Sequence, residues 1–196
     1  MYKSLLVFSL ISVIAFACNT DDVEPSVANV EYELYSTFLD SDFFQDEVAV
    51  VEAESFGNLS SFNIREYYLD YVRQQYPEIE ANLLQNLAVV ANDSLLFEAS
   101  KFRTNKQVVI INRDELLSIF SDANGTSPQE MWNNFQLQYG ETAARVALSR
   151  VSFNGAADEA LFGVAVGRGA YYGYVVHLKK VEGKWVIADV INHWVT

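Results

Sequence analysis

The C-terminal part of the chain, residues 145–196, constrains the fold most, because four runs rich in β-branched and aromatic residues follow one another there. Each run is separated from the next by a short cluster that contains glycine. Runs of this kind, parted by turn residues, are typical of consecutive strands joined by tight connections. The segment therefore predicts a four-stranded antiparallel meander.

The chain before this meander predicts helices and two further strands. Ser127-Pro128-Gln129-Glu130 is the clearest local signal, with Ser127 as N-cap, proline in the first turn and Glu130 placed to complete a capping box. Apolar spacing and turn residues predict helices over 29–41, 63–77, 79–90, 113–120 and 127–140, and strands over 46–53 and 107–112. The expected fold class is α+β, with a C-terminal four-stranded antiparallel meander packed by helices and additional N-terminal strands.

The last hairpin, around Val181-Glu182-Gly183, offers two turn solutions. A two-residue turn of type I′ needs a positive φ at Glu182, which is costly for a residue other than glycine. A three-residue loop asks this only of Gly183. We therefore favour the longer loop, which sets Lys180 opposite Lys184.

In that register both faces of the hairpin are largely apolar. One face is expected to carry Tyr172, Tyr174, Val176 and Leu178 with Val186, Ala188, Val190 and Trp194, and the other Val175 and His177 with Trp185, Ile187, Asp189, Ile191 and His193. Water would be in contact with one of these faces unless each is covered. Helices, or a second copy of the chain in a homodimer, must therefore pack on both sides.

The second face gathers the candidate catalytic residues His177, Asp189 and His193. With Val175 opposite Asp189, His177 lies diagonal to the carboxylate, at about 7–8 Å between α-carbons. A His/Asp pair in a cleft supports acid–base chemistry. A histidine among valines and isoleucines is more often a core residue bonded to a carboxylate or the backbone, and no serine or cysteine stands in a nucleophile motif. We favour the structural role.

No cofactor or metal is expected. Cys18 is the only cysteine. The two histidines and one carboxylate are not spaced in the sequence as a metal-ligand motif requires, so they do not indicate a metal centre. Gly167-Arg168-Gly169 has the composition of a phosphate loop, but the residues after it predict a strand rather than a helix. This glycine pair therefore indicates a connection between strands.

The N-terminus has the pattern of an exported lipoprotein. Lys3 precedes an apolar run, and Ala15-Phe16-Ala17-Cys18 resembles a bacterial lipobox, whose cysteine becomes lipidated. We expect a signal peptide over 1–17, a flexible acidic tether over 18–29 and a single domain over 30–196. The alternative is a buried N-terminal helix with an incidental cysteine. Asn19 favours the outer membrane, with its periplasmic or surface side left open.

The net charge of −13 limits the classes of molecule that the protein is expected to bind. Nucleic acids and anionic lipid surfaces require a basic face, so neither is an expected partner. Attachment to a membrane would come through a lipid on Cys18 instead. An acidic protein favours cationic partners, and an unknown protein or small molecule is the expected ligand.

Three stretches carry a resemblance to a known family. LSRVSFN, EALFGVAVGRGAYYGYVVHLKK and EGKWVIADVINHWVT are similar to the C-terminal signature of a family of bacterial secreted proteins and lipoproteins whose activity is unassigned. The last hairpin also resembles the closing strands of nuclear-transport-factor-2-like domains, in which a curved sheet holds a pocket against helices. The order of elements departs from theirs, so no active-site residue is carried over.

The leading hypothesis is a non-catalytic binding or assembly module of the bacterial envelope. Lipidation, acidic charge, aromatic richness and missing catalytic motifs motivate it. One alternative is a small hydrolase or lyase that uses His177, Asp189 and His193 in a pocket. Another is an acidic immunity-type factor that neutralises a basic toxin.

Overall fold

A computed structural model describes residues 27–55, 66–91, 93–121 and 125–195, without the side chains of 27, 66–69 and 193–195. Its helices are α1 (Val27–Leu39), α2 (Glu66–Gln75), α3 (Ala81–Val90), α4 (Arg113–Phe120) and α5 (Pro128–Tyr139), with a short 3₁₀ turn at Ala99–Lys101. Its strands are β1 (Val48–Glu52), β2 (Gln107–Ile111), β3 (Ala143–Phe153), β4 (Glu159–Gly167), β5 (Tyr171–Val181) and β6 (Lys184–Val195).

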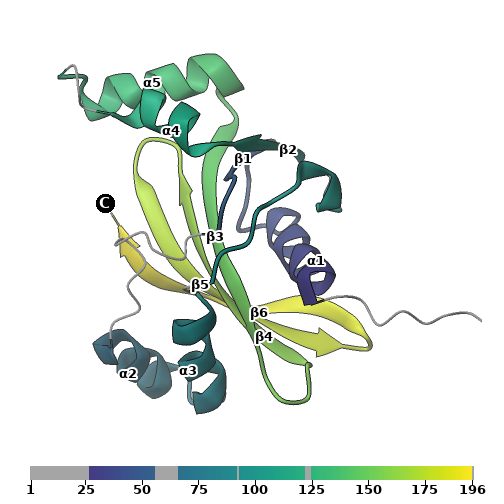
Figure 1. Cartoon of the computed structure of the whole chain (residues 1–196). Coiled ribbons are helices and arrows are strands. Elements are labelled where there is room, and N and C mark those ends of the chain that lie inside the picture. Colours follow the sequence, from purple (N-terminus) through teal and green to yellow (C-terminus); the bar gives the residue numbers. More distant parts are fainter. Residues whose placement is uncertain (1–26, 56–65, 92, 122–124, 196) are drawn as a thin grey trace, which may run out of the picture.

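The strands form one six-stranded sheet in the order β2-β1-β3-β4-β5-β6 (Figure 1). Strands β3 to β6 run antiparallel to one another, which confirms the predicted meander and the α+β class. Strand β1 lies parallel to both β2 and β3. Parallel neighbours need crossover connections. The crossover from β1 to β2 contains α2–α3, and the chain then passes through α4–α5 before it returns as β3 on the other side of β1.

Helices cover both faces of this sheet. Helix α1 covers one face of the sheet, and α3 and α5 pack on side chains that point to the opposite face (Figure 1). The core beneath α1 joins Tyr35 and Phe38 to Phe162 of β4 and to the hairpin of β5 and β6. Leu83 and Leu87 of α3 pack with Val175 and Ile191. The expectation that both faces of the last hairpin need cover is confirmed, and helices of the same chain supply it.

Local capping chemistry sets the bounds of α5. The Ser127 side chain accepts a hydrogen bond from the Glu130 N–H, and the Glu130 carboxylate accepts one from the Ser127 N–H, so the predicted capping box is present. The helix ends at Tyr139, and the next residue, Gly140, has a φ of 103°, which residues with a side chain rarely adopt. Phe135 and Trp132 then face β1 and the start of β3.

The predicted register of the last hairpin is wrong. Val181 pairs with Lys184, so the loop has two residues, Glu182 and Gly183, with φ of 50° and 80° as in a type I′ turn. The twist of this turn matches the twist of the strands, and that match outweighs the cost of a left-handed glutamate. Trp185 and Ile187 consequently lie on the α1 side, in the core with Leu178, rather than beside His177.

A β-bulge then changes the phase of β6. The register shifts between the Leu178–Ile187 pair and the His177–Asp189 pair, which leaves Ala188 as the extra residue. Because one added residue reverses which side chains face the core, Asp189 and Ile191 return to the face of His177 and Val175. That part of the predicted face assignment is confirmed.

The N-terminal predictions fall mostly outside the described residues. The signal peptide over 1–17 and Cys18 lie there, and so do the first residues of the helix predicted over 63–77. The predicted tether over 18–29 is too long, because residues 27–29 form the first turn of α1. Among the helices that the structure describes, none is long and apolar enough to cross a membrane.

Candidate functional site

The structure places His177 and Asp189 directly opposite each other on β5 and β6, rather than diagonally. The Asp189 Oδ2 lies 4.0 Å from His177 Nδ1, and Glu159 of β4 approaches Nε2 more closely, at 3.4 Å. Burial lowers the pKa of His177, and the neighbouring Glu159 acts in the opposite direction. Sequence reasoning missed Glu159, which reaches the histidine only through the β4–β5 pairing.

This arrangement resembles a core histidine more than an acid–base pair. His177 is fully buried, and neither of the cavities described below has it in its wall. A general base must reach its substrate to remove a proton. The side chain of His193 lies outside the described part of the chain, so the geometry brings together only two of the three predicted residues.

An open pocket of about 410 Å³ lies on the α1 side of the sheet. It is formed between the loop that joins α1 to β1 and the turn that joins β4 to β5, and we call it the loop–turn pocket. Its walls include Phe38, Phe43, Asp46, Arg168, Tyr172 and Tyr174. Small-molecule sites are concave, mainly apolar and aromatic, and about 300–1,000 Å³ in volume.

Asp46 is the buried charged group of this pocket. It lies in the loop between α1 and β1, separated from the first residue of β1 by Glu47, and is 3% exposed. Arg168 Nε lies 2.8 Å from its Oδ1, but this ion pair lacks hydrogen-bond geometry, and Oδ1 receives no hydrogen bond from the residues that the structure describes. Burial raises the pKa of Asp46, while Arg168 and, more weakly, Lys106 act to lower it.

Gly167 is the last residue of β4, and Arg168 and Gly169 lie in the turn that leads to β5, as the sequence predicts for a strand connection. Gly167 is closely packed there, since a Cβ on it would lie 2.7 Å from the Ala170 carbonyl oxygen and 2.8 Å from Trp132 Cη2. Gly169 has open space around it. Sequence reasoning missed the meeting of Arg168 with Asp46, because no local spacing links segments so far apart in the chain.

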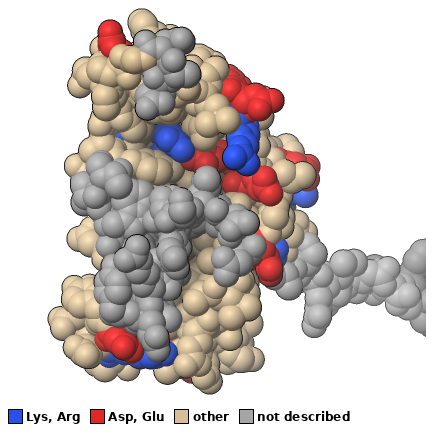
Figure 2. Space-filling view, turned by 60° about the vertical axis from the view of Figure 1, so that its left-hand side comes forward, with Lys and Arg blue, Asp and Glu red and all other residues tan. Residues whose placement is uncertain are grey.

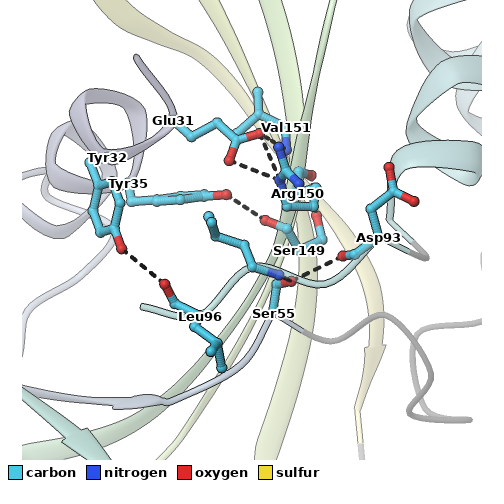
Figure 3. A network of polar contacts seen from close by, with 10 residues as sticks. Glu31, Tyr32, Tyr35, Ser55, Asp93, Leu96, Ser149, Arg150 and Val151 are labelled. Carbon is cyan, nitrogen blue, oxygen red and sulfur yellow. Dashed lines mark hydrogen bonds and ion pairs between the residues drawn. The ribbon is translucent and has the colours of Figure 1, made fainter. Parts of the chain in front are cut away.

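A second polar cluster fastens α1 to an irregularity in β3 (Figure 3). The strand register shifts between Leu148 and Val151. Arg150 Nε donates to both carboxylate oxygens of the buried Glu31, at 3.0 and 2.9 Å, and the Tyr35 hydroxyl donates to the Ser149 carbonyl at 2.7 Å. A cavity of about 280 Å³ adjoins this cluster. The main polar groups of the cluster already bond one another, so we assign the cluster the structural role of holding the bulge in place.

A third charged group links three strands on the opposite face. Arg145 of β3 lies between the rings of Phe120 and Tyr171, at 4.8 and 4.6 Å from their centroids. Its Nε donates to Glu52 at 2.8 Å, and the Tyr171 hydroxyl donates to the same oxygen at 3.1 Å. Cation–π contacts and a charge-assisted bond both stabilise this packing.

The other charged side chains that the structure describes form neither a metal site nor, on the face shown in Figure 2, a patch of one sign. Over the ranges that the structure describes, no three histidine, cysteine, aspartate or glutamate side chains converge on a point that would hold a metal ion. On the face that Figure 2 shows, acidic and basic atoms lie beside one another rather than in a patch of one sign. The loop–turn pocket is therefore the strongest candidate for a functional site.

Comparison of the chain with models of protein families, with curated proteins and with solved structures found no match. The fold and the site themselves define a class: a small α+β domain whose mixed sheet carries an open pocket with aromatic walls and a buried carboxylate. The resemblance of the C-terminal segment to bacterial envelope proteins stays a prediction.

Proposed function

We propose that this protein is an outer-membrane lipoprotein, anchored through Cys18, that acts as a non-catalytic binding module of the envelope. Its ligand is a small organic molecule or a side chain of similar size, held in the loop–turn pocket. The observation that carries the proposal is the pocket itself, at about 410 Å³ with aromatic walls around a buried carboxylate.

The exposure of the aromatic walls supports binding. Phe43 is 62% exposed and Tyr172 is 41% exposed, although both are large rings that a folding chain tends to bury. Exposed apolar groups that are gathered in a hollow mark interaction sites. A ligand that packs between these rings would remove their surface from water.

The composition of the pocket wall favours binding over turnover. The wall contains one carboxylate, one arginine and one glutamine among apolar, tyrosine and glycine residues, and no serine, cysteine or histidine. General acid–base or nucleophilic catalysis needs a proton acceptor or nucleophile set beside an activating partner. Asp46 has only a cation for its charged neighbour within the wall.

Filling the pocket should weaken ligand binding. Gly169→Phe places a ring at the pocket mouth, at a position where a Cβ meets no atom within 4 Å, so the fold is expected to tolerate it. In NMR titrations of the full-length protein with small aromatic amidines, amides and carboxylates, we expect saturable shifts at Phe43 and Tyr172. The Gly169→Phe variant should weaken binding by at least about tenfold.

Gly155→Phe is the matched control, because it adds the same ring in the β3–β4 turn, also in open space. It should leave the titration unchanged. Absence of saturable shifts at the pocket for every compound would refute the binding role, and so would equal losses in the two variants.

Anchoring is tested separately at Cys18. Cys18→Ala removes the thiol that would carry the lipid, so the variant should lose palmitate label and leave the membrane fraction after cell fractionation. Thr20→Ala, two residues further on, should keep both properties. Retention of Cys18→Ala in the membrane fraction, together with its label, would contradict lipidation at this residue.

A further inference from the structure

Asp46 has the properties of a carboxylate that lacks its full set of partners. A buried carboxylate is stable only when it is paired and hydrogen-bonded. Asp46 is 3% exposed, and its own backbone N–H and the more distant Lys106 also favour its charged form. Its Oδ1, however, receives no hydrogen bond from the described residues, because Arg168 Nε, 2.8 Å away, lacks hydrogen-bond geometry. The pocket thus offers a buried negative charge with an unfilled hydrogen-bonding position.

Arg168 is a weakly held partner for this charge. Its side chain is 52% exposed, and it projects from a turn between two glycines. Water competes with Asp46 for this half-exposed guanidinium, and the pair lacks hydrogen-bond geometry, whereas Arg150 donates two hydrogen bonds to the buried Glu31. A better-placed cation can therefore displace the Arg168 guanidinium at small cost, and the guanidinium marks where such a cation would sit.

We propose that the ligand of the loop–turn pocket carries an amidinium, guanidinium or ammonium group, which pairs with Asp46 and displaces Arg168. This proposal rests on the binding function proposed above. The aromatic rings of Phe43, Tyr172 and Tyr174 line the same pocket and favour a cation next to apolar carbon. The net charge of −13 draws cations toward the protein.

The opposite arrangement would make Arg168 the receptor for an anion. The two arrangements differ in the sign of one result. If Arg168 competes with the ligand for Asp46, its removal strengthens binding; if Arg168 receives the ligand, its removal weakens binding.

The test uses the purified full-length protein and three probes of similar shape: benzamidine as cation, benzamide as neutral compound and benzoate as anion. Calorimetry should show benzamidine binding at least about tenfold more tightly than the other two, as expected for a charge-assisted pair. Asp46→Asn should remove this preference, and Arg168→Gln should tighten benzamidine binding about threefold or more. Asp114→Asn and Arg113→Gln, both at exposed positions of α4, should change neither.

Each outcome decides a separate point. Equal binding of benzamide and benzamidine overturns cation recognition but leaves a binding pocket, and tighter benzoate binding that Arg168→Gln weakens shows an anion site. Binding of none of the probes refutes the proposed function as well. If Asp46→Asn fails to fold, two results still distinguish a cation site from an anion site: the probe that the wild type prefers, and whether Arg168→Gln strengthens or weakens its binding.

The same cation can come from a free molecule or from a peptide side chain. N-acetyl-arginine amide and a blocked Ala-Arg-Ala peptide distinguish these sources. Tighter binding of the peptide, by about tenfold, supports an arginine of a partner protein as the ligand, and equal binding supports a free cation. Failure of both to compete with benzamidine overturns the guanidinium part of the proposal.

Discussion

Arg150→Ala is expected to lower the free energy of unfolding by about 3–5 kcal/mol, the range found when one partner of a buried ion pair is removed. The Glu31 side chain is 1% exposed, and Arg150 Nε bonds both of its oxygens. Among the residues that the structure describes, the Val151 N–H is the one other donor to this carboxylate, at 3.3 Å. Without the guanidinium, Glu31 must stay charged in an apolar surrounding or take up a proton.

The loss should depend on pH. Burial raises the pKa of Glu31 above its usual 4.5, and Arg150 opposes this rise. A carboxyl whose folded pKa is raised contributes most stability below its unfolded pKa, and that contribution is lost as pH rises through the folded pKa. Because the pKa rises further without Arg150, the deficit of Arg150→Ala should be largest near pH 7 and shrink toward pH 4.5.

Urea denaturation at several pH values measures this effect. Arg73→Ala is the control, because Arg73 pairs with Asp70 at 3.0 Å on the surface of α2, where such pairs contribute about 0–1 kcal/mol. A deficit for Arg150→Ala that equals that of the control, or that grows as pH falls, would contradict the role of this pair in holding α1 to the β3 bulge.

Gly167→Ala is expected to destabilise the fold by about 1–3 kcal/mol, as overpacking of a filled site does. The added methyl would lie 2.7 Å from both the Ala170 carbonyl oxygen and Tyr171 Cδ2. The first of these is backbone in the turn itself, so relief requires the turn to move. That movement would also shift Arg168 away from Asp46.

Gly169→Ala is the matched control, since it adds the same methyl two residues away where no atom lies within 4 Å. Thermal and urea unfolding should show a clear loss for Gly167→Ala and a change within about 0.5 kcal/mol for the control. Equal stability of the two variants would show that the turn accommodates the methyl without strain.

Much of the secondary structure could be predicted because its causes are local. The capping box at Ser127 and Glu130 depends on residues three apart, and the apolar spacing of α1 reflects one helical face. The meander followed from alternating runs between glycine-bearing turns. The predicted register of the last hairpin was wrong, because strand twist favours a two-residue turn at Glu182 and Gly183. The bulge at Ala188 then changed which residues of β6 face each side of the sheet.

The sequence by itself determined the helices, the strands and the need to cover both faces of the last hairpin. The tertiary structure alone decided that β1 and β2 join the meander as parallel strands, since short apolar runs do not specify their neighbours. The tertiary structure alone also determined where the candidate site lies. Asp46 precedes β1 and Arg168 follows β4, two strands that β3 separates in the sheet. Only the folded chain brings the loop between α1 and β1 to the turn between β4 and β5, where the carboxylate meets the guanidinium.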